Sequence, residues 1–320
     1  MIKSAALWLA LAHSPSWAPF PFAQTFATPG AAVAAFLSEA HGVVAFGELH
    51  QTAKTASVRS TIARFTDEIL PAVAPRAAHL IVETWVSRGT CGEPEKRVTE
   101  DVARTTERPP ATENEIVRLL RRAKELGVAP HVLDVDCHEY QTILTGNPGR
   151  VPAPSRDGLR RAEPGSVHAV QVGDHVDYDR LLKLTRAHLQ RAIEQALALP
   201  HPPDRPLVLV YGGALHNDLE PAPALADYSF GPAIDRLTGG DYREMDLYVP
   251  ELVDALPALR AERWYPVWVA AQRANAGTLE GSPLPPATDS AGGSPAPSRR
   301  PGTTLLIRRG PRSAIVLFQR

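Results

Sequence analysis

The sequence predicts an α/β fold with a central, mostly parallel sheet flanked by helices and a C-terminal antiparallel hairpin at the sheet edge. Apolar runs of strand length alternate along the chain with longer segments of helical spacing, which is the order of βαβ units. Several of these runs are apolar throughout, as parallel strands are because helices cover both faces of their sheet. The chain ends with two short β-type runs separated by Gly310-Pro311, which indicates the hairpin.

Five runs are expected to form the parallel part of the sheet. The first, second and fourth of them are apolar and rich in β-branched residues, as buried parallel strands are. Their ranges are 42–48, 78–85, 129–138, 206–216 and 242–252. The hairpin occupies residues 303–320.

Helical spacing covers three segments between these runs, residues 53–70, 112–126 and 179–199. In the second, Thr112 and Glu115 fit a capping box at the start, and Gly127 fits a C-terminal stop. The third ends at a proline-rich stretch, "PHPPDRP".

The domain organisation follows from composition. Residues 25–275 are predicted to form one α/β domain, with an irregular insertion or lid at 146–167. Residues 276–302 are rich in Ser, Pro and Gly and are expected to be a flexible loop, after which the hairpin at 303–320 completes the same domain.

The N-terminal segment 1–24 has the features of a signal peptide. Lys3 precedes an apolar stretch from Ala5 to Ala12, and small residues follow at Ala18 and Ala23. We therefore expect export to the periplasm or medium. The alternatives are a mobile or packed N-terminal tail and a cytoplasmic protein. No later stretch approaches the ~20 apolar residues of a membrane span.

The two cysteines, Cys91 and Cys137, each follow a predicted strand closely. In an exported protein they could form one disulfide, and two buried thiols are the alternative.

The charge balance argues against nucleic acid as a partner. The chain has 34 Lys and Arg residues against 35 Asp and Glu, for a formal net charge of -1. No basic excess is available to neutralise phosphates or an anionic membrane. A small molecule or peptide is the expected partner, and the oligomeric state is open.

Acidic and histidine side chains stand at the ends of four predicted strands. Because ligands bind outside the carboxyl ends of parallel strands, these side chains are the candidate site. They are Glu48 and His50, then Glu83, then Asp134, Asp136 and His138, and finally His216 and Asp218. Strand alternation would place Asp134, Asp136 and His138 on one face.

Each residue also has a purely structural interpretation. Glu48 could be a solvated loop residue, Asp218 a helix cap, and Asp134 the partner of a nearby arginine. Their coincidence favours function, because several buried-type strands that end together in carboxylates need a cation or a shared proton. Gly47 and Gly212-Gly213 would allow either close approach of a ligand or only tight turns.

Other catalytic patterns are missing from the sequence. It contains no Walker loop, GxGxxG, GxSxG, CxxC or HExxH motif. The acidic stretch Asp174, His175, Asp177 and Asp179 precedes a predicted long helix, so we interpret it as helix capping rather than as a metal site.

These motifs together resemble a known superfamily. Gly47-Glu48-Leu49-His50 is similar to a GExH-type strand end, Gly213-Ala214-Leu215-His216 to a later GxxH-type end, and Glu83 to the acidic residue between them. Over about residues 36–252 the chain resembles the Tiki/TraB, erythromycin esterase and ChaN-like superfamily, closest to the ChaN-like haem-binding uptake proteins. It departs from the ChaN lipoprotein form, since no cysteine stands near its N-terminus.

The resemblance implies an α/β fold with a pocket at one sheet edge. Members of the superfamily include metal-dependent proteases, esterases that hydrolyse a lactone with histidine and glutamate, and haem-binding proteins. The resemblance would make Glu48, His50, Glu83 and His216 the site. Asp136 and His138 are added to the metal ligands by strand geometry alone.

The leading hypothesis is a metal-dependent hydrolase of an ester or amide bond. Glu48, His50 and His216, with Asp136 and His138, would bind Mn²⁺, Zn²⁺ or a similar divalent ion, and Glu83 would be a ligand or general base. A metal-free variant would use a histidine held in one tautomer by Glu48 or Glu83.

Haem binding in iron uptake is the alternative outside hydrolysis. A haem ligand would need to be an accessible His or Tyr beside an apolar wall. The available aromatic residues are Tyr140, Tyr178, Tyr211, Trp264, Tyr265 and Trp268. Their other interpretation, which we favour, is membership of the hydrophobic core.

Overall fold

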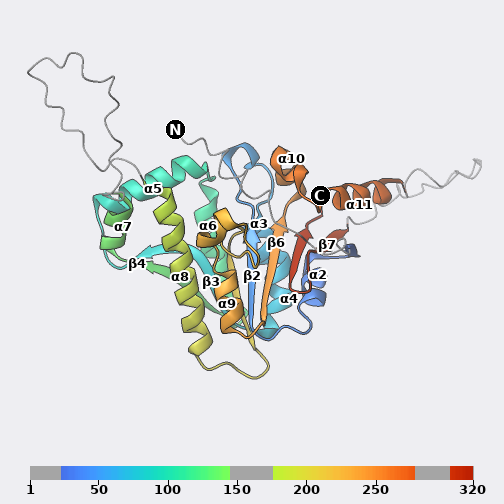
Figure 1. Cartoon of the computed structure of the whole chain (residues 1–320), viewed down its shortest axis with the longest axis horizontal. Coiled ribbons are helices and arrows are strands. Elements are labelled where there is room, and N and C mark those ends of the chain that lie inside the picture. The colour runs from blue at the N-terminus through green and yellow to red at the C-terminus, as the bar shows by residue number, and fades with distance from the viewer. Residues whose placement is uncertain (1–22, 145–175, 278–302, 320) are drawn as a thin grey trace, which may run out of the picture.

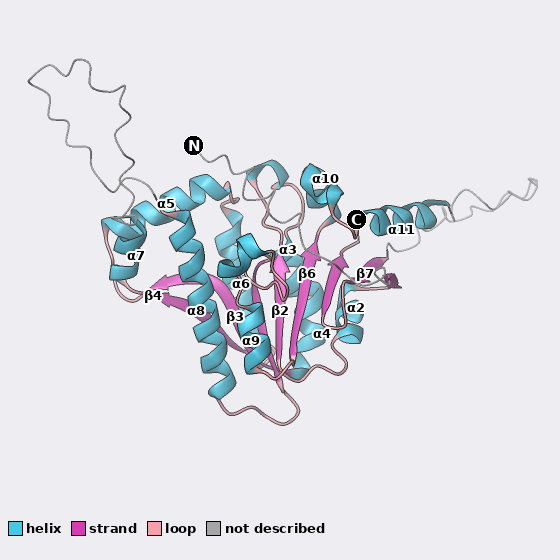
Figure 2. Ribbon diagram, viewed as in Figure 1, coloured by secondary structure: helices cyan, strands magenta, loops and turns pink. Residues whose placement is uncertain are grey.

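The computed structural model describes residues 23–144, 176–277 and 303–319, and within them it is an α/β fold built on one eight-stranded sheet (Figures 1 and 2). The order of strands across the sheet is β1-β7-β8-β6-β2-β5-β3-β4. The strands are β1 (Ala23–Phe26), β2 (Val43–Glu48), β3 (Ala77–Ser87), β4 (Ala129–Val135), β5 (Leu207–Gly213), β6 (Tyr242–Tyr248), β7 (Thr304–Arg308) and β8 (Ser313–Leu317).

The predicted fold class is confirmed. Strands β4, β3, β5, β2, β6 and β8 pair in parallel. The C-terminal hairpin β7–β8 is antiparallel, as predicted, and β8 attaches it to β6. Strand β1, which the sequence pattern did not predict, pairs antiparallel with β7 and lies outside the hairpin.

Helices cover both faces of this sheet. The described α-helices are α2 (Pro29–Phe36), α3 (Thr61–Arg64), α4 (Leu70–Val73), α5 (Glu93–Thr106), α6 (Ala111–Glu125), α7 (Cys137–Leu144), α8 (Tyr178–Ala198), α9 (Gly231–Leu237), α10 (Pro250–Ala255) and α11 (Tyr265–Gly277). In Figure 1, α8 and α9 lie in front of the sheet, while α2 and α4 lie behind it.

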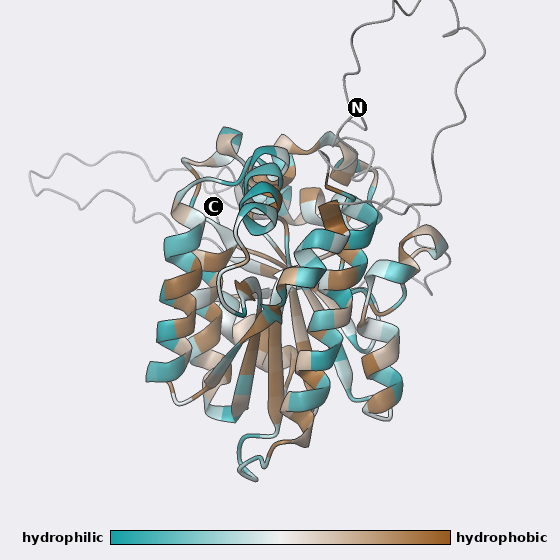
Figure 3. Ribbon diagram, turned by 90° about the vertical axis from the view of Figure 1, so that its left-hand side faces the viewer, coloured by the Kyte–Doolittle hydropathy of each residue, from teal (hydrophilic) through white to brown (hydrophobic). Residues whose placement is uncertain are grey.

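Strand alternation divides the core between the two faces. In β2, Val44 and Phe46 pack with residues of α2, α3, α4 and α6, whereas Val43 and Ala45 pack with residues of α8 and α9. Figure 3 shows the hydrophobic strands in the interior, between helices that carry hydrophilic residues. Burial on both faces explains why β2 and β5 are continuous apolar runs.

Two of the helix predictions need correction. The segment 53–70 is not one helix, because α3 begins only at Thr61 and continues through a π-helical turn, Phe65–Ile69, into α4. The capping box of α6 is also wrong. This helix begins at Ala111 after Pro110, and Glu115 instead accepts a hydrogen bond from Ser60 Oγ at 2.8 Å.

Other local predictions are confirmed. Gly127 follows the end of α6 with a φ of 73°, a left-handed conformation that favours glycine. Helix α8 occupies Tyr178–Ala198, and the Asp177 side chain caps it by accepting a hydrogen bond from Arg180 N.

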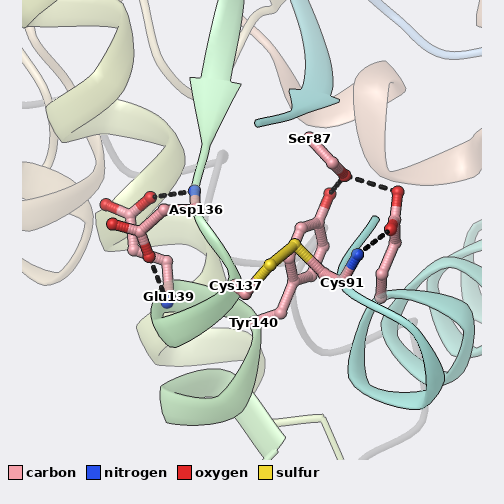
Figure 4. Close-up of a disulfide and its surroundings, with 7 residues drawn as sticks. Ser87, Cys91, Asp136, Cys137, Glu139 and Tyr140 are labelled. Carbon is pink, nitrogen blue, oxygen red and sulfur yellow. Dashed lines mark hydrogen bonds between the residues drawn. A yellow bond between two sulfur atoms is a disulfide. The ribbon is translucent and has the colours of Figure 1, made fainter. Parts of the chain in front are cut away.

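Cys91 and Cys137 form a disulfide, with a sequence separation of 46 residues. It joins the start of α5 to the start of α7 (Figure 4). Beside it, Ser87 Oγ donates a hydrogen bond to Glu95 and lies 3.2 Å from the Tyr140 hydroxyl, so the end of β3 belongs to the same cluster.

Several expectations fall wholly or mostly outside the described residues. These are the signal peptide up to residue 22, the 146–167 insertion, Asp174 with His175, and the loop from residue 278 to 302. Ala23 and Gln24 already belong to β1. Within the described ranges, no helix has the length and apolar character needed to cross a membrane.

Candidate functional site

Three adjacent strands deliver the candidate side chains at their carboxyl ends. Strand β2 pairs with β5 so that Gly47 faces Gly212 and Glu48 faces Gly213, and β3 lies on the other side of β5. Parallel pairing therefore brings Glu83, four residues before the end of β3, close to the level where β2 and β5 end. The structure gathers Glu48, His50, Glu83 and His216 there.

Glu48 and His50 form the centre of this group. Glu48 Oε1 lies 2.7 Å from His50 Nδ1, and Tyr211 of β5 donates its hydroxyl hydrogen to Glu48 Oε2. Because an ionised carboxylate can only accept, the Nδ1 hydrogen of His50 points at Glu48. His50 Nε2 is then the nitrogen with the lone pair.

Arg108 completes the environment of His50. Its Nη2 donates a hydrogen bond to His50 Nε2 at 2.6 Å. Arg108 lies in the loop between α5 and α6, after Glu107, which has a left-handed φ of 50°. The Glu107 carbonyl accepts a hydrogen bond from Ala53 N at 2.7 Å, so this loop is tied to the chain just beyond His50.

The pKa values of this group follow from burial and charge. Burial alone would raise the pKa of Glu48, but the hydrogen bond and charge of His50, the charge of Arg108 and the Tyr211 hydroxyl together lower it. Burial and the negative charge of Glu48 raise the pKa of Tyr211 well above its ordinary value. Glu48 is therefore an ionised acceptor and Tyr211 a neutral donor.

Glu83 and His216 form a second pair on the other side of Gly213. Glu83 Oε2 accepts a hydrogen bond from Gly213 N at 2.7 Å, and Glu83 Oε1 lies 3.8 Å from His216 Nε2. His216 Nδ1 donates to the Tyr228 carbonyl at 2.8 Å, which leaves His216 Nε2 directed at Glu83. A separation of 3.8 Å is too long for a direct hydrogen bond.

The glycines are needed because these side chains pass close to the backbone. A Cβ on Gly212 would lie 2.4 Å from Glu83 Oε2, and one on Gly213 would lie 3.0 Å from His50 Nε2. Neither glycine has a positive φ. Close approach of site residues, rather than a special turn, thus explains the glycine pair.

A small pocket opens over Glu48 and His50. Its free space suits about one water molecule. The polar part of its lining includes Glu48, His50, Glu83 and Arg108, and the apolar part comes from β3, α3 and α6 through Val82, Ile62 and Ile116.

Asp136 and His138 do not join this group. Strand β4 ends at Val135, so His138 lies in α7 and the expected strand alternation does not apply. Val135 is level with Ser87 of β3, four residues along the chain beyond Glu83. Asp136 Oδ1 instead accepts a hydrogen bond from Glu139 N, a cap visible in Figure 4.

Asp134 and Asp218 are also held elsewhere. Asp134 is exposed and pairs with Arg88 at 3.3 Å, which confirms its structural interpretation. Asp218 lies near Asp246 and Arg309, and burial raises its pKa. It contributes no helix cap, but accepts a hydrogen bond from Glu220 N at 3.3 Å.

Sequence reasoning missed three residues of this environment. Arg108 carries no strand-end or motif signal, and Asn217 follows His216 without a recognisable role. Tyr211 was considered only as a haem ligand, although its position opposite Phe46, two residues before Glu48, follows from pairing β2 with β5.

Most of the possible metal-ligating atoms in this arrangement already contact other protein groups. Both oxygens of Glu48, both ring nitrogens of His50 and one oxygen of Glu83 already have protein partners. Glu83 Oε1 and His216 Nε2 are the remaining pair, and the Arg108 guanidinium brings a positive charge to His50. Within residues 23–144, 176–277 and 303–319, no group of three or more His, Cys, Asp or Glu is arranged to hold a metal.

Comparison with known proteins yields no relative, since no family model, curated protein or solved structure matches the chain significantly.

The aromatic residues considered for haem are engaged in other contacts. Trp264 and Trp268 belong to the core cluster, with Tyr265 packed against it, and Trp264 stacks on Tyr248. The Tyr140 and Tyr178 hydroxyls contact Ser87 and Asp101, respectively. The core interpretation of the tryptophans is confirmed.

Proposed function

We propose that this protein hydrolyses ester or amide bonds with His50 as the general base, without a metal ion. The observation that carries the proposal is the setting of His50. A largely buried carboxylate, Glu48, accepts a hydrogen bond from Nδ1, and Nε2 lines a pocket of water size. This is the arrangement by which an orienting acid fixes the tautomer of a catalytic imidazole.

In this mechanism His50 Nε2 removes a proton from water as the water oxygen bonds to the carbonyl carbon of the substrate. Glu48 stabilises the resulting imidazolium through Nδ1, as its lowered pKa allows. Collapse of the tetrahedral intermediate breaks the bond to the leaving group, which takes the proton that His50 Nε2 removed from water.

Arg108 has two roles in this scheme. In the structure its guanidinium donates to His50 Nε2. When a substrate carbonyl enters, we propose that this donor turns to the carbonyl oxygen, which frees the lone pair of His50 and stabilises the developing negative charge.

Glu83 and His216 form the opposite wall. Their free atoms, Oε1 and Nε2, are 3.8 Å apart, so one polar atom of a substrate could bridge them. We propose that His216 and Glu83 bind the leaving-group side of the substrate, while the imidazolium of His50 supplies its proton.

The order and strand positions of the GExH-type and GxxH-type motifs support membership of the Tiki/TraB, erythromycin esterase and ChaN-like superfamily, which we also propose. The disulfide supports an exported location, because disulfides persist in oxidising compartments. A metal-dependent hydrolase remains the competing form of the same site. No contact of the described aromatic residues favours haem.

The test uses purified full-length protein and p-nitrophenyl acetate. We expect His50→Asn and Glu48→Gln to lower kcat/KM at least about 100-fold. His41→Asn is the matched control, because His41 is exposed at the opposite end of β2. The fold of each variant is checked by circular dichroism.

A chelator separates the two forms of the hydrolase. Full activity after treatment with 1,10-phenanthroline, with no metal detected by plasma mass spectrometry, supports the metal-free mechanism. Loss of activity that Zn²⁺ or Mn²⁺ restores would replace it with the metal-dependent one. Unchanged activity in His50→Asn would refute His50 both as the general base of the metal-free mechanism and as a ligand in the metal-dependent one.

A further inference from the structure

Asn217 lies between two turns at the carboxyl ends of the strands, the Glu48–His50 turn after β2 and the Gly213–His216 turn after β5. It follows His216, is 3% exposed, and makes contacts with both turns through its side-chain amide. One amide atom is 2.7 Å from the Ala214 carbonyl oxygen, and the other is 3.1 Å from Gly47 N. Gly47 precedes Glu48, and Ala214 follows Gly213, the residue that holds Glu83.

The contacts fix the orientation of this amide. With Nδ2 toward Ala214 and Oδ1 toward Gly47, the amide donates to a carbonyl oxygen and accepts from an N–H. In the opposite orientation Nδ2 would donate to Asp246 Oδ1 at 3.3 Å. The amide oxygen would then face the Ala214 carbonyl oxygen, and the amide nitrogen would face Gly47 N. We adopt the first orientation because it satisfies two backbone groups instead of none.

This orientation of the amide requires a particular protonation state of Asp246. The amide atom near Gly47 N lies 3.3 Å from Asp246 Oδ1, so two acceptors would face each other if Asp246 were ionised. A proton on Asp246 Oδ1 turns the contact into a hydrogen bond. Asp246 Oδ2 can still accept from Arg309 Nη1, at 2.9 Å.

The space around these groups is filled. A Cβ on Gly47 would lie 2.6 Å from the Asn217 amide and 2.7 Å from Asp246 Oδ1. The Tyr242 hydroxyl donates to the Asn217 carbonyl, and Glu244 Oε2 accepts from Leu219 N at 2.8 Å. The residues after His216 are therefore fixed against β6.

We propose that Asn217 is a positioning residue that sets the spacing between the Glu48–His50 turn and the Gly213–His216 turn, and that a neutral Asp246 donates a hydrogen bond to it. The inference rests on the proposed function only for its catalytic consequence. Burial raises the pKa of Asp246, although the charge of Arg309 opposes this effect. The titratable groups around it are Asp218, Glu244, Tyr248, Glu262 and Arg309.

The test compares three variants of the full-length protein. Asn217→Ala removes both amide contacts. Asn217→Asp keeps the shape but loses the donor to Ala214 O. Asp246→Asn supplies a permanent donor in place of the protonated oxygen. Asp204→Asn, at an exposed position, is the control.

With p-nitrophenyl acetate we expect kcat to fall at least about tenfold in both Asn217 variants, with KM changed less than about twofold, because a misplaced base loses rate rather than binding. Asp246→Asn should keep at least about half of the wild-type kcat. An Asp246→Asn variant as impaired as Asn217→Ala would overturn the neutral Asp246.

A second readout does not need activity. Long-range ¹H–¹⁵N spectra of histidine-labelled protein report the tautomers of His50 and His216. The wild type and Asp246→Asn should show His216 protonated at Nδ1, and the Asn217 variants should show averaging of the two tautomers. Wild-type tautomers in both Asn217 variants would refute the positioning role. An inactive wild-type protein whose tautomers respond as expected would refute only the proposed function.

Discussion

Glu244 gives the sharpest prediction about stability, because its carboxyl group is buried with more acids than bases. It is 2% exposed and is paired with Arg309, while Asp218 and Asp246 lie nearby. Burial, followed by these neighbouring carboxylates, outweighs the guanidinium and raises the pKa of Glu244 to about 8 from 4.5. The folded state therefore binds a proton that the unfolded state releases.

The sign follows from linkage. Since the folded-state pKa is the higher one, the stabilisation is fully present below 4.5 and is lost as the pH rises through about 8. The pKa difference corresponds to about 5 kcal/mol in total, of which about 3 to 4 kcal/mol is lost between pH 5 and pH 8. Glu244→Gln removes the titration and keeps the shape.

The assay is urea unfolding, followed by tryptophan fluorescence and circular dichroism at several pH values between 5 and 8. We expect the free energy of unfolding of the wild type, minus that of Glu244→Gln, to decrease by about 3 to 4 kcal/mol over this range. Glu220→Gln, at an exposed residue of the neighbouring loop, should leave the pH dependence unchanged. A difference that stays constant, or that increases with pH, would refute a raised pKa and mean that the ion pair with Arg309 dominates.

Three further predictions concern other parts of the molecule. Replacing Cys91 and Cys137 together by Ala should lower the free energy of unfolding by up to about 4 kcal/mol, the chain-entropy value for a loop of this length; unchanged urea unfolding would contradict it. Gly212→Ala should abolish p-nitrophenyl acetate hydrolysis while the fold survives, because the new Cβ meets Glu83 Oε2; retained activity would show that this carboxyl group can move freely. Burial lowers the pKa of His131, so its contribution to stability is lost as the pH falls below 6.5. Between pH 7 and pH 5 the free energy of unfolding should therefore decrease less in His131→Asn than in the wild type. An equal decrease in both proteins would contradict this.

The sequence by itself determined the fold class, the strands other than β1, and the four side chains that meet at the sheet edge. Apolar runs of strand length identify β2, β3 and β5, because burial on both faces leaves a pattern within each segment. Parallel pairing then requires their carboxyl ends to lie at one edge. Glu48, His50, Glu83 and His216 could therefore be grouped without coordinates.

The same rule failed for Asp136 and His138 because it says nothing of how far each strand runs. Strand β3 continues four residues past Glu83 before it reaches the level where β4 ends. Strand β4 ends at Val135 and α7 begins at Cys137, so the alternation of side chains along a strand does not extend to His138.

Only the tertiary structure decided which partners the four residues have. Arg108 reaches His50 across 58 residues of sequence, and Tyr211 reaches Glu48 across 163. Periodicity records which side of a local element is buried, but a contact between a loop and a distant strand depends on the path of the whole chain. That path places a guanidinium on His50 Nε2 and the Asn217 amide between Gly47 and Ala214, and no local sequence pattern records either contact.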